Sequence, residues 1–370
     1  MKTLRPKAEV RSASPAPAPG PGAAAATLTV DEDHQGQRLD NFLTRVCRGV
    51  PRSHVYQLIR SGQVRVNGGR ASADRKLSCG DRVRIPPYRS DSEPQPSIDP
   101  MARSRGTGAG TGPRLSALFE DDDLIALDKP AGLAVHGGSG VSLGAIEALR
   151  RQRPEARFLE LVHRLDRETS GVLLVAKRRQ ALLELQRQFR ERRVAKVYVA
   201  VVAGRWPLRT RVIEHALTRL AAPDGDRRVQ VDEDGREART RVTGLLRLSL
   251  AAVGEFTLVK AEIDTGRTHQ IRVHLAAEGY PIAGDDKYGD YSLNRQLAKL
   301  GLRRMYLHAL RLVCKSPSSA RVLKLETDPG DAFRRLIVQG GGNDPGPAGI
   351  AAMLARGAPG LFRPGSASLP

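Results

Sequence analysis

The chain has 370 residues, with 60 Lys and Arg against 40 Asp and Glu, which gives a formal net charge of +20 at pH 7. This excess of positive charge favours an acidic partner, and nucleic acid is the first expectation. A hydrophobic fraction of 40% excludes wholesale disorder and is enough for two domains. Aromatic residues make up only 4%, so an extended base-stacking surface is not expected.

The three cysteines, Cys47, Cys79 and Cys314, lie far apart, and the chain has no Cys-x-x-Cys motif. Neither a disulfide framework nor a thiolate zinc site is therefore expected. No run of 18 apolar residues is present that could span a bilayer, and the apolar stretch 23–26 is too short for a signal peptide. These features predict a cytoplasmic protein without membrane contact.

Composition divides the chain into five parts. Residues 1–27 are basic and rich in Pro, Ala and Gly, and we expect a disordered tail there. Residues 88–113 are rich in Pro, Gly and Ser and lack hydrophobic periodicity, which is typical of a linker. Residues 339–370 are Gly- and Pro-rich and are expected to be a second disordered tail. Two folded domains are therefore predicted, at 28–87 and 114–338.

The segment 28–87 has the pattern of two short helices followed by a small sheet. Apolar residues recur at helical spacing within 39–46, and Ser53 is expected to cap a second helix. Residues 64–69 predict a strand entering a tight turn, and residues 81–85 alternate apolar with charged side chains as a strand does.

The same segment is strongly basic. Eleven Arg and Lys residues between 37 and 87 stand against three Asp, a net charge of 11 − 3 = +8. A solvated surface that only keeps the protein soluble is one interpretation. Contact with the phosphate backbone of a nucleic acid is the interpretation that we favour. The candidate RNA-binding residues in this segment are Arg38, Arg52, Arg60 and Arg65.

The segment 114–338 mixes strands and helices without regular βαβ alternation. Residues 124–127 predict a buried strand, and a helix is expected through 142–149. The apolar positions of 182–193 mark one face of a helix, and valines alternate along 197–201 as in a strand. An α+β fold is therefore predicted.

A dense polar cluster, His163-Arg-Leu-Asp-Arg-Glu-Thr-Ser, lies between two apolar stretches. Such clusters sit in loops held by a rigid scaffold, where functional residues concentrate. Asp166 is flanked by Arg164 and Arg167, so it could serve only to pin the loop through ion pairs. A catalytic carboxylate is the second interpretation, and the pattern alone does not decide between the two.

The stretch His163-Arg-Leu-Asp-Arg-Glu-Thr-Ser-Gly-Val-Leu-Leu-Val-Ala-Lys strongly resembles the signature of the pseudouridine synthases of the large-subunit ribosomal RNA type. Lys129-Pro-Ala-Gly-Leu-Ala-Val-His before it and Gly266-Arg-Thr-His-Gln-Ile-Arg-Val-His after it resemble further motifs of the family, in the expected order. The small basic segment resembles an S4 RNA-binding domain. The resemblance covers nearly all of 28–338, and implies a catalytic domain with a mixed, mainly antiparallel sheet.

The resemblance also implies roles for individual residues. Asp166 matches the family's essential aspartate, which works near C1′ of the target ribose. Tyr198 matches the tyrosine that stacks on the flipped base and is proposed to help remove the C5 proton, although an ordinary strand aromatic would look the same. Arg272 matches the arginine that pairs with the catalytic carboxylate. Arg164 matches a residue that fills the space left by the flipped base.

The implied reaction converts specific uridines of 23S ribosomal RNA to pseudouridine without a cofactor or metal. It breaks the N1–C1′ bond, turns the uracil and joins C5 to C1′, with no redox change and no water consumed. One carboxylate near C1′ can act as a nucleophile, or as a base at the ribose C2′. An arginine beside it orients the carboxylate and favours its charged form. Phosphate contacts offset the cost of unstacking the target.

Other functions stay open at this point. A sibling enzyme would act on other ribosomal or transfer RNA uridines, a non-catalytic ribosome-associated RNA binder would share the basic segment, and a hydrolytic RNA glycosidase would release free uracil. The expected partner is 23S ribosomal RNA or a large-subunit precursor. A monomer is expected because the sequence has no heptad seam. Residues 207–243 carry no motif to which we can assign a chemical role.

Three further motifs are expected to have no metal or phosphate chemistry. His269 and His274 are spaced i, i+5, which places them on opposite faces of a strand or roughly 140° apart on a helix. Residues 137–140 lack the order of a phosphate-binding loop and predict a turn. The acidic pair in Gly284-Asp-Asp-Lys-Tyr-Gly lacks the further ligands of a magnesium site and is expected to be structural.

Overall fold

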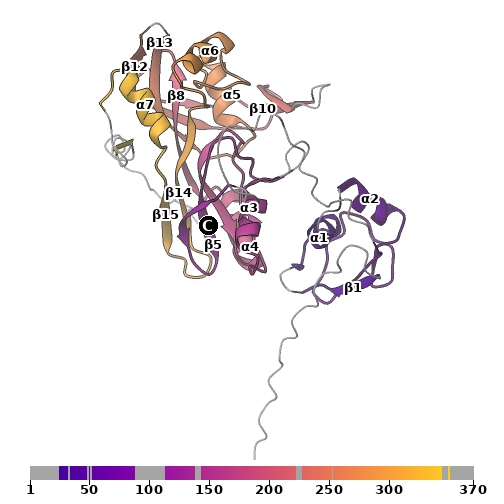
Figure 1. The fold of residues 1–370 in the computed structure, drawn as a ribbon. Coiled ribbons are helices and arrows are strands. Elements are labelled where there is room, and N and C mark those ends of the chain that lie inside the picture. The colour runs from indigo at the N-terminus through magenta and orange to yellow at the C-terminus, as the bar shows by residue number, and fades with distance from the viewer. Residues whose placement is uncertain are drawn as a thin grey trace, which may run out of the picture. The chain divides into compact units, whose positions relative to one another are not determined.

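The computed structural model describes residues 25–31, 34–47, 50, 52–87, 113–137, 143–221, 227–251, 253–343 and 349–350. The chain divides between Gly108 and Ala109 into two compact units (Figure 1). Most of the stretches expected to be tails and linker lie outside the described residues.

The first unit contains two short helices and a three-stranded antiparallel sheet. Its elements are β1 (Ala26–Thr29), α1 (Leu39–Val46), α2 (Arg52–Arg60), β2 (Arg65–Val66) and β3 (Arg82–Ile85), with the strands in the order β1-β3-β2. Phe42 of α1, Leu58 of α2 and Val83 of β3 are buried in one cluster. The predicted helices and strands are confirmed, except that α2 begins at Arg52, so Ser53 lies inside the helix and does not cap it.

The second unit is built on one large mixed sheet. Eight strands follow the order β4-β5-β7-β14-β8-β13-β12-β9, while β6 pairs with β7 and β15 with β14. Only β7 and β14 run parallel among the described pairs, which confirms the mixed, mainly antiparallel sheet. The strands are β4 (Ser116–Glu120), β5 (Leu124–Lys129), β6 (Glu160–Leu161), β7 (Ser170–Ala176), β8 (Ala195–Ala203), β9 (Thr210–Ile213), β12 (Thr240–Leu250), β13 (Gly254–Ile263), β14 (Leu307–Lys315) and β15 (Val322–Glu326).

Helices cover both faces of this sheet (Figure 1). They are α3 (Ala145–Gln152), α4 (Arg179–Arg190), α5 (Gln270–Ala277), α6 (Tyr291–Lys299) and α7 (Asp331–Gln339), and a separate hairpin is formed by β10 (Leu217–Ala221) and β11 (Arg227–Val231). Successive residues of a strand point to opposite faces, so one strand contributes to two cores. Leu124 packs with α4 on one face, whereas Ile125 packs with α3 on the other.

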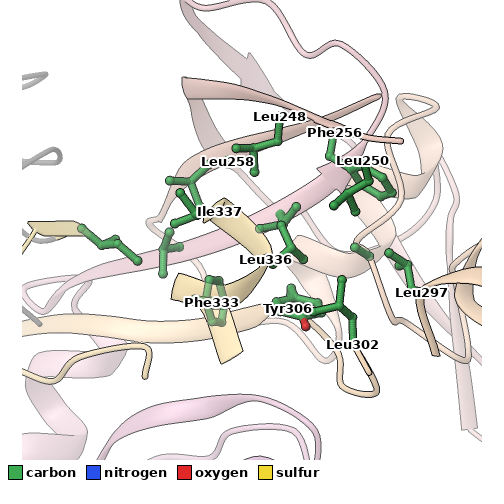
Figure 2. Close-up of a cluster of buried hydrophobic side chains, with 14 of the residues drawn as sticks. Leu248, Leu250, Phe256, Leu258, Leu297, Leu302, Tyr306, Phe333, Leu336 and Ile337 are labelled. Carbon is green, nitrogen blue, oxygen red and sulfur yellow. The ribbon is translucent and has the colours of Figure 1, made fainter. Parts of the chain in front are cut away.

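The face that carries α4 also carries α7. Figure 2 shows Phe333, Leu336 and Ile337 of α7 packed against Leu248 and neighbouring side chains of β12 and β13. Ile350, which lies in the stretch expected to be a tail, is buried in the same cluster. This core packs on the same strands as the α5 core, on the opposite face of the sheet.

The opposite face carries α3 at one end and α5 at the other. Ile271 and Leu275 of α5 pack on it together with the fully buried Trp206. Tyr198 of β8 packs against both the α3 core and the α5 core. A side chain on β8 at this position therefore lies where the two cores of this face meet.

We predict that Gly171→Ala will disrupt the pairing of β7 with β14. Gly171 has a φ of +115°, and a Cβ there would lie 2.2 Å from the carbonyl oxygen of Ala309. The clash should lower the free energy of unfolding by about 3 kcal/mol, measured by urea denaturation. Gly279→Ala is the control, because Gly279 also has a positive φ but a Cβ there meets nothing within 4 Å. It should cost about 1 kcal/mol, and equal costs for the two variants would contradict the clash.

Candidate active site

Asp166 lies in the loop between β6 and β7, and a buried lysine fixes this loop. Lys129 ends β5 and is fully buried, and its Nζ donates hydrogen bonds to the carbonyl oxygens of Pro130 (2.9 Å), Leu133 (2.7 Å) and Arg167 (3.0 Å). Burial lowers the pKa of Lys129 to about 8. All three ammonium protons have acceptors, so the loop that carries Asp166 is tied to the end of β5.

Arg272 of α5 connects Asp166 to a second carboxylate. Its Nε and Nη2 each lie 2.7 Å from an oxygen of Asp285, in a bidentate pair, and its Nη1 lies 3.4 Å from Oδ2 of Asp166. Arg272 and Asp285 are 5% and 1% exposed, whereas Asp166 is 27% exposed. The predicted pairing of Arg272 with Asp166 is therefore present, but Asp285 receives the two shorter bonds.

Charge and hydrogen bonding keep this pair ionised. Burial opposes the charged form of both groups, but the hydrogen bonds and charge of Asp285 more than compensate and raise the pKa of Arg272. The guanidinium in turn lowers the pKa of Asp285, again against the effect of burial. The ring of Tyr288 lies under the guanidinium carbon, 5.1 Å from it, in a cation–π contact. Arg272 is thus a fixed cation that faces Asp166.

Tyr198 lies beside Asp166 on the same face of the sheet. Burial and, secondly, the charge of Asp166 raise the pKa of Tyr198. The phenol therefore keeps its proton at neutral pH, and it cannot serve there as an ionised base. Its position suits a ring that stacks on a planar group.

These side chains line a small open pocket of about 90 Å³. Its lining includes the charged Asp166 and Arg272 and the apolar Ile263 and Leu307. Arg164 also lines this pocket and is exposed to solvent. The structure therefore brings Asp166, Tyr198, Arg272 and Arg164 together, as the sequence predicted.

The other candidate RNA-binding residues lie in the first unit. Arg60 is exposed at the end of α2, and Arg65 lies on β2 opposite Arg84 of β3. Arg38 forms a bidentate ion pair with Asp40, at 3.1 and 2.9 Å, so its charge is partly neutralised. The side chain of Arg52 lies outside the described part of the chain.

Sequence reasoning missed three residues that build the site. Lys129 stood in a recognised motif but had no assigned role, and Asp285 was expected only to be structural. His269 was weighed only as a metal ligand, yet its Nε2 lies 3.8 Å from Oδ1 of Asp166. Its partner in that hypothesis, His274, is fully buried and bonds through Nε2 to the carbonyl oxygen of His215 (3.0 Å). The described residues hold no group of three or more potential metal-ligating side chains.

Comparison with known proteins agrees with this geometry. The chain matches the RNA pseudouridylate synthase family over residues 123–277 and the S4 domain over residues 37–83. It is 48% identical over 306 residues to the ribosomal large subunit pseudouridine synthase C of Haemophilus influenzae, covering 83% of this chain and 92% of that protein. The protein of the same name from Escherichia coli (strain K12) is 45% identical over 307 residues, covering 82% and 93%.

A solved structure also resembles this chain. Human RNA pseudouridylate synthase domain containing 1 matches with a TM-score of 0.51 and 28% identity, covering 61% of this chain and 87% of that one. The chain therefore belongs to the RNA pseudouridylate synthase family and contains an S4 domain. It is an RNA-modifying isomerase, and the family resemblance seen in the sequence is confirmed. In the described part of the chain, no helix is long and apolar enough to cross a membrane.

We predict that Asp285→Asn will impair both folding and isomerisation. Removing one charge of a buried ion pair leaves the other uncompensated, which should lower the free energy of unfolding by about 3 kcal/mol. Arg272 would then turn toward Asp166, and the isomerisation rate should fall by about tenfold or more. The control is Asp286→Asn, because Asp286 is 85% exposed and 4.0 Å from Arg272. If both variants behave alike, Asp285 does not hold Arg272 in place.

Proposed function

We propose that this protein isomerises specific uridines of 23S ribosomal RNA to pseudouridine and that Asp166 acts at the target ribose. The observation that carries this proposal is the position of Asp166, which lies open in a pocket while a buried arginine faces one of its oxygens. The names of the two bacterial relatives support ribosomal large-subunit RNA as the substrate.

Asp166 can act in either of two ways. The carboxylate can attack C1′ as a nucleophile, or take a proton from C2′ and stabilise the positive charge that develops on the sugar. In both cases the N1–C1′ bond breaks and the uracil leaves as an anion that stays in the pocket. The uracil then turns and its C5 bonds to C1′. On the first route this displaces Asp166 and breaks its bond to C1′, and on the second route Asp166 returns its proton to C2′. The C5 proton is lost and N1 takes up a proton, so no atom is gained or lost overall. Arg272 attracts and orients the carboxylate throughout.

Two other pocket residues handle the base. Tyr198 would stack on the flipped uracil, since its neutral phenol lies beside Asp166. Arg164 is exposed where it lines the pocket and would fill the space that the uridine leaves in the RNA. Extrusion of the uridine unstacks it at a cost of a few kcal/mol, which phosphate contacts offset.

The first unit would supply affinity for the RNA. We extend the proposal to a domain arrangement of tail 1–27, RNA-binding domain 28–87, linker 88–113, catalytic domain 114–338 and tail 339–370. The structure shifts two of these bounds, since β1 begins at Ala26 and Ile350 packs in the core of the catalytic unit. Arg60 and Arg65 are the best candidates for phosphate contacts there, because Arg38 is paired with Asp40. A monomer that works in the cytoplasm on ribosomal RNA or on a large-subunit precursor completes the proposal.

We predict that Asp166→Asn will abolish isomerisation and preserve RNA binding. Large-subunit RNA carrying 5-tritiated uridine should release tritium with the wild type, and at a rate lower by more than about 10³-fold with the variant. Carbodiimide-dependent stops of reverse transcription map the product sites. Because isomerisation conserves mass, an unchanged RNA mass by mass spectrometry would exclude hydrolytic loss of uracil. Absence of release with the wild type, in naked RNA and assembling particles alike, would favour a binding protein or another RNA substrate.

We also predict that Arg60→Ala combined with Arg65→Ala will weaken RNA binding and flatten its salt dependence. Each lost phosphate contact should reduce the slope of log K against log salt concentration by about 1. The double variant Arg153→Ala with Arg187→Ala is the charge-matched control, since both arginines pair with glutamates of the catalytic unit. An equal change of slope in both would show that net charge alone sets the affinity.

A further inference from the structure

The turn 284–289 supports the active site through two side chains. Its Asp285 holds Arg272 through the bidentate pair described above. Its Tyr288 holds a second residue of the pocket, because the hydroxyl lies 2.8 Å from Nδ1 of His269. The backbone N–H groups of Lys287 and Tyr288 both donate to Oδ1 of Asp285, at 2.9 and 3.0 Å, so one rigid turn carries both supports.

His269 is fixed at the start of α5 in an uncommon backbone conformation. Its φ of 54° and ψ of 19° lie in the left-handed region, which costs about 1 kcal/mol or more for a residue with a Cβ. The side chain of Gln270 stabilises the preceding turn by accepting hydrogen bonds from the Thr265 hydroxyl (2.7 Å) and the Arg267 N–H (3.1 Å). The strained conformation directs the ring of His269 into the pocket.

The hydrogen-bond chain favours one tautomer of this ring. The backbone N–H of Val229 donates to the hydroxyl oxygen of Tyr288 (2.9 Å), and the hydroxyl proton of Tyr288 is available to donate to Nδ1 of His269. Burial lowers the pKa of His269 against the opposing charge of Asp166, so the ring is neutral at pH 7. A neutral imidazole that accepts at Nδ1 carries its proton on Nε2. This Nε2 lies 3.8 Å from Oδ1 of Asp166, within reach of an electrostatic contact but longer than a hydrogen bond.

We infer that His269 is a positioning residue for Asp166: its Nε2 lies beside Oδ1 and attracts it, while Arg272 faces Oδ2. This inference rests on the proposed role of Asp166 in catalysis. With a polar group facing each oxygen, rotation of the carboxylate is restricted. Two nitrogens of Arg272 bond to Asp285, so Arg272 makes only one contact with Asp166. With that contact alone, the carboxylate of Asp166 would be free to rotate.

Two substitutions separate this role from a purely structural one. Asparagine tolerates the left-handed conformation and can reach Tyr288 from the position of Nδ1, but it is too short to reach Asp166. Glutamine can place an amide N–H near the position of Nε2. The positioning role therefore predicts that His269→Gln retains activity and His269→Asn does not, whereas a role in capping α5 or contacting Tyr288 predicts the opposite order.

The experiment measures single-turnover tritium release and RNA affinity with the full-length protein. His269→Asn should lower the rate by about 10-fold to 30-fold with the RNA dissociation constant within about twofold, and His269→Gln should stay within about threefold of the wild type. Equal rates for the two variants, or a loss confined to affinity, would overturn the inference. If the wild type itself releases no tritium, the proposed function fails instead.

The protonation state of the ring can be tested without turnover. In protein labelled with ¹⁵N-histidine, His269 should show an unprotonated Nδ1 and a protonated Nε2, and Tyr288→Phe should shift the Nδ1 signal. A proton on Nδ1 in the wild type would refute the inference whatever the activities of the variants. The variant His274→Gln identifies the NMR signals of His274, the histidine within α5, which bonds through Nε2 to a backbone carbonyl.

Discussion

The buried ion pair between Arg272 and Asp285 is the interaction on which the site depends. Two charges with almost no solvent contact are stable only when they satisfy one another, so neither side chain can move without the other. The pair anchors α5 to the turn 284–289 and leaves one guanidinium nitrogen directed at Asp166. The position of the cation relative to the proposed catalytic carboxylate is thus set by a contact that does not include that carboxylate.

The sheet places the other half of the site. The α3 core and the α5 core lie on one face, and Tyr198 packs against both. The loop of Asp166 arrives at this place because β7 pairs in parallel with β14, where Gly171 allows the backbone of Ala309 to approach. Lys129 then ties that loop to the end of β5 through three carbonyl oxygens. Rigid packing on one face therefore brings together residues that are far apart in the sequence.

Sequence patterns predicted the elements better than the contacts between them. Helical spacing located α1 and α4, and alternation located β3 and β8, because both patterns reflect local burial. The motif around Asp166 led to the correct family and to a pocket that contains the predicted catalytic residues. The role of Asp285 could not be deduced, because an acidic pair in a turn has the same local pattern whether it binds solvent, a metal or a distant arginine. The left-handed backbone of His269 likewise depends on tertiary contacts, since nothing in Thr-His-Gln requires it.

The lengths of the contacts at Asp166 bear on how such a site can work. Short bidentate bonds from Arg272 to Asp166 would engage both oxygens and make the carboxylate a poor nucleophile and a weak base. Here the short bonds go to Asp285, and the donors that face Asp166 lie at 3.4 and 3.8 Å. A carboxylate held at these distances keeps lone pairs available for the ribose, yet it stays next to positive charge. If Asp166 acts as proposed, Asp285 favours its reactivity by occupying the arginine that would otherwise immobilise Asp166.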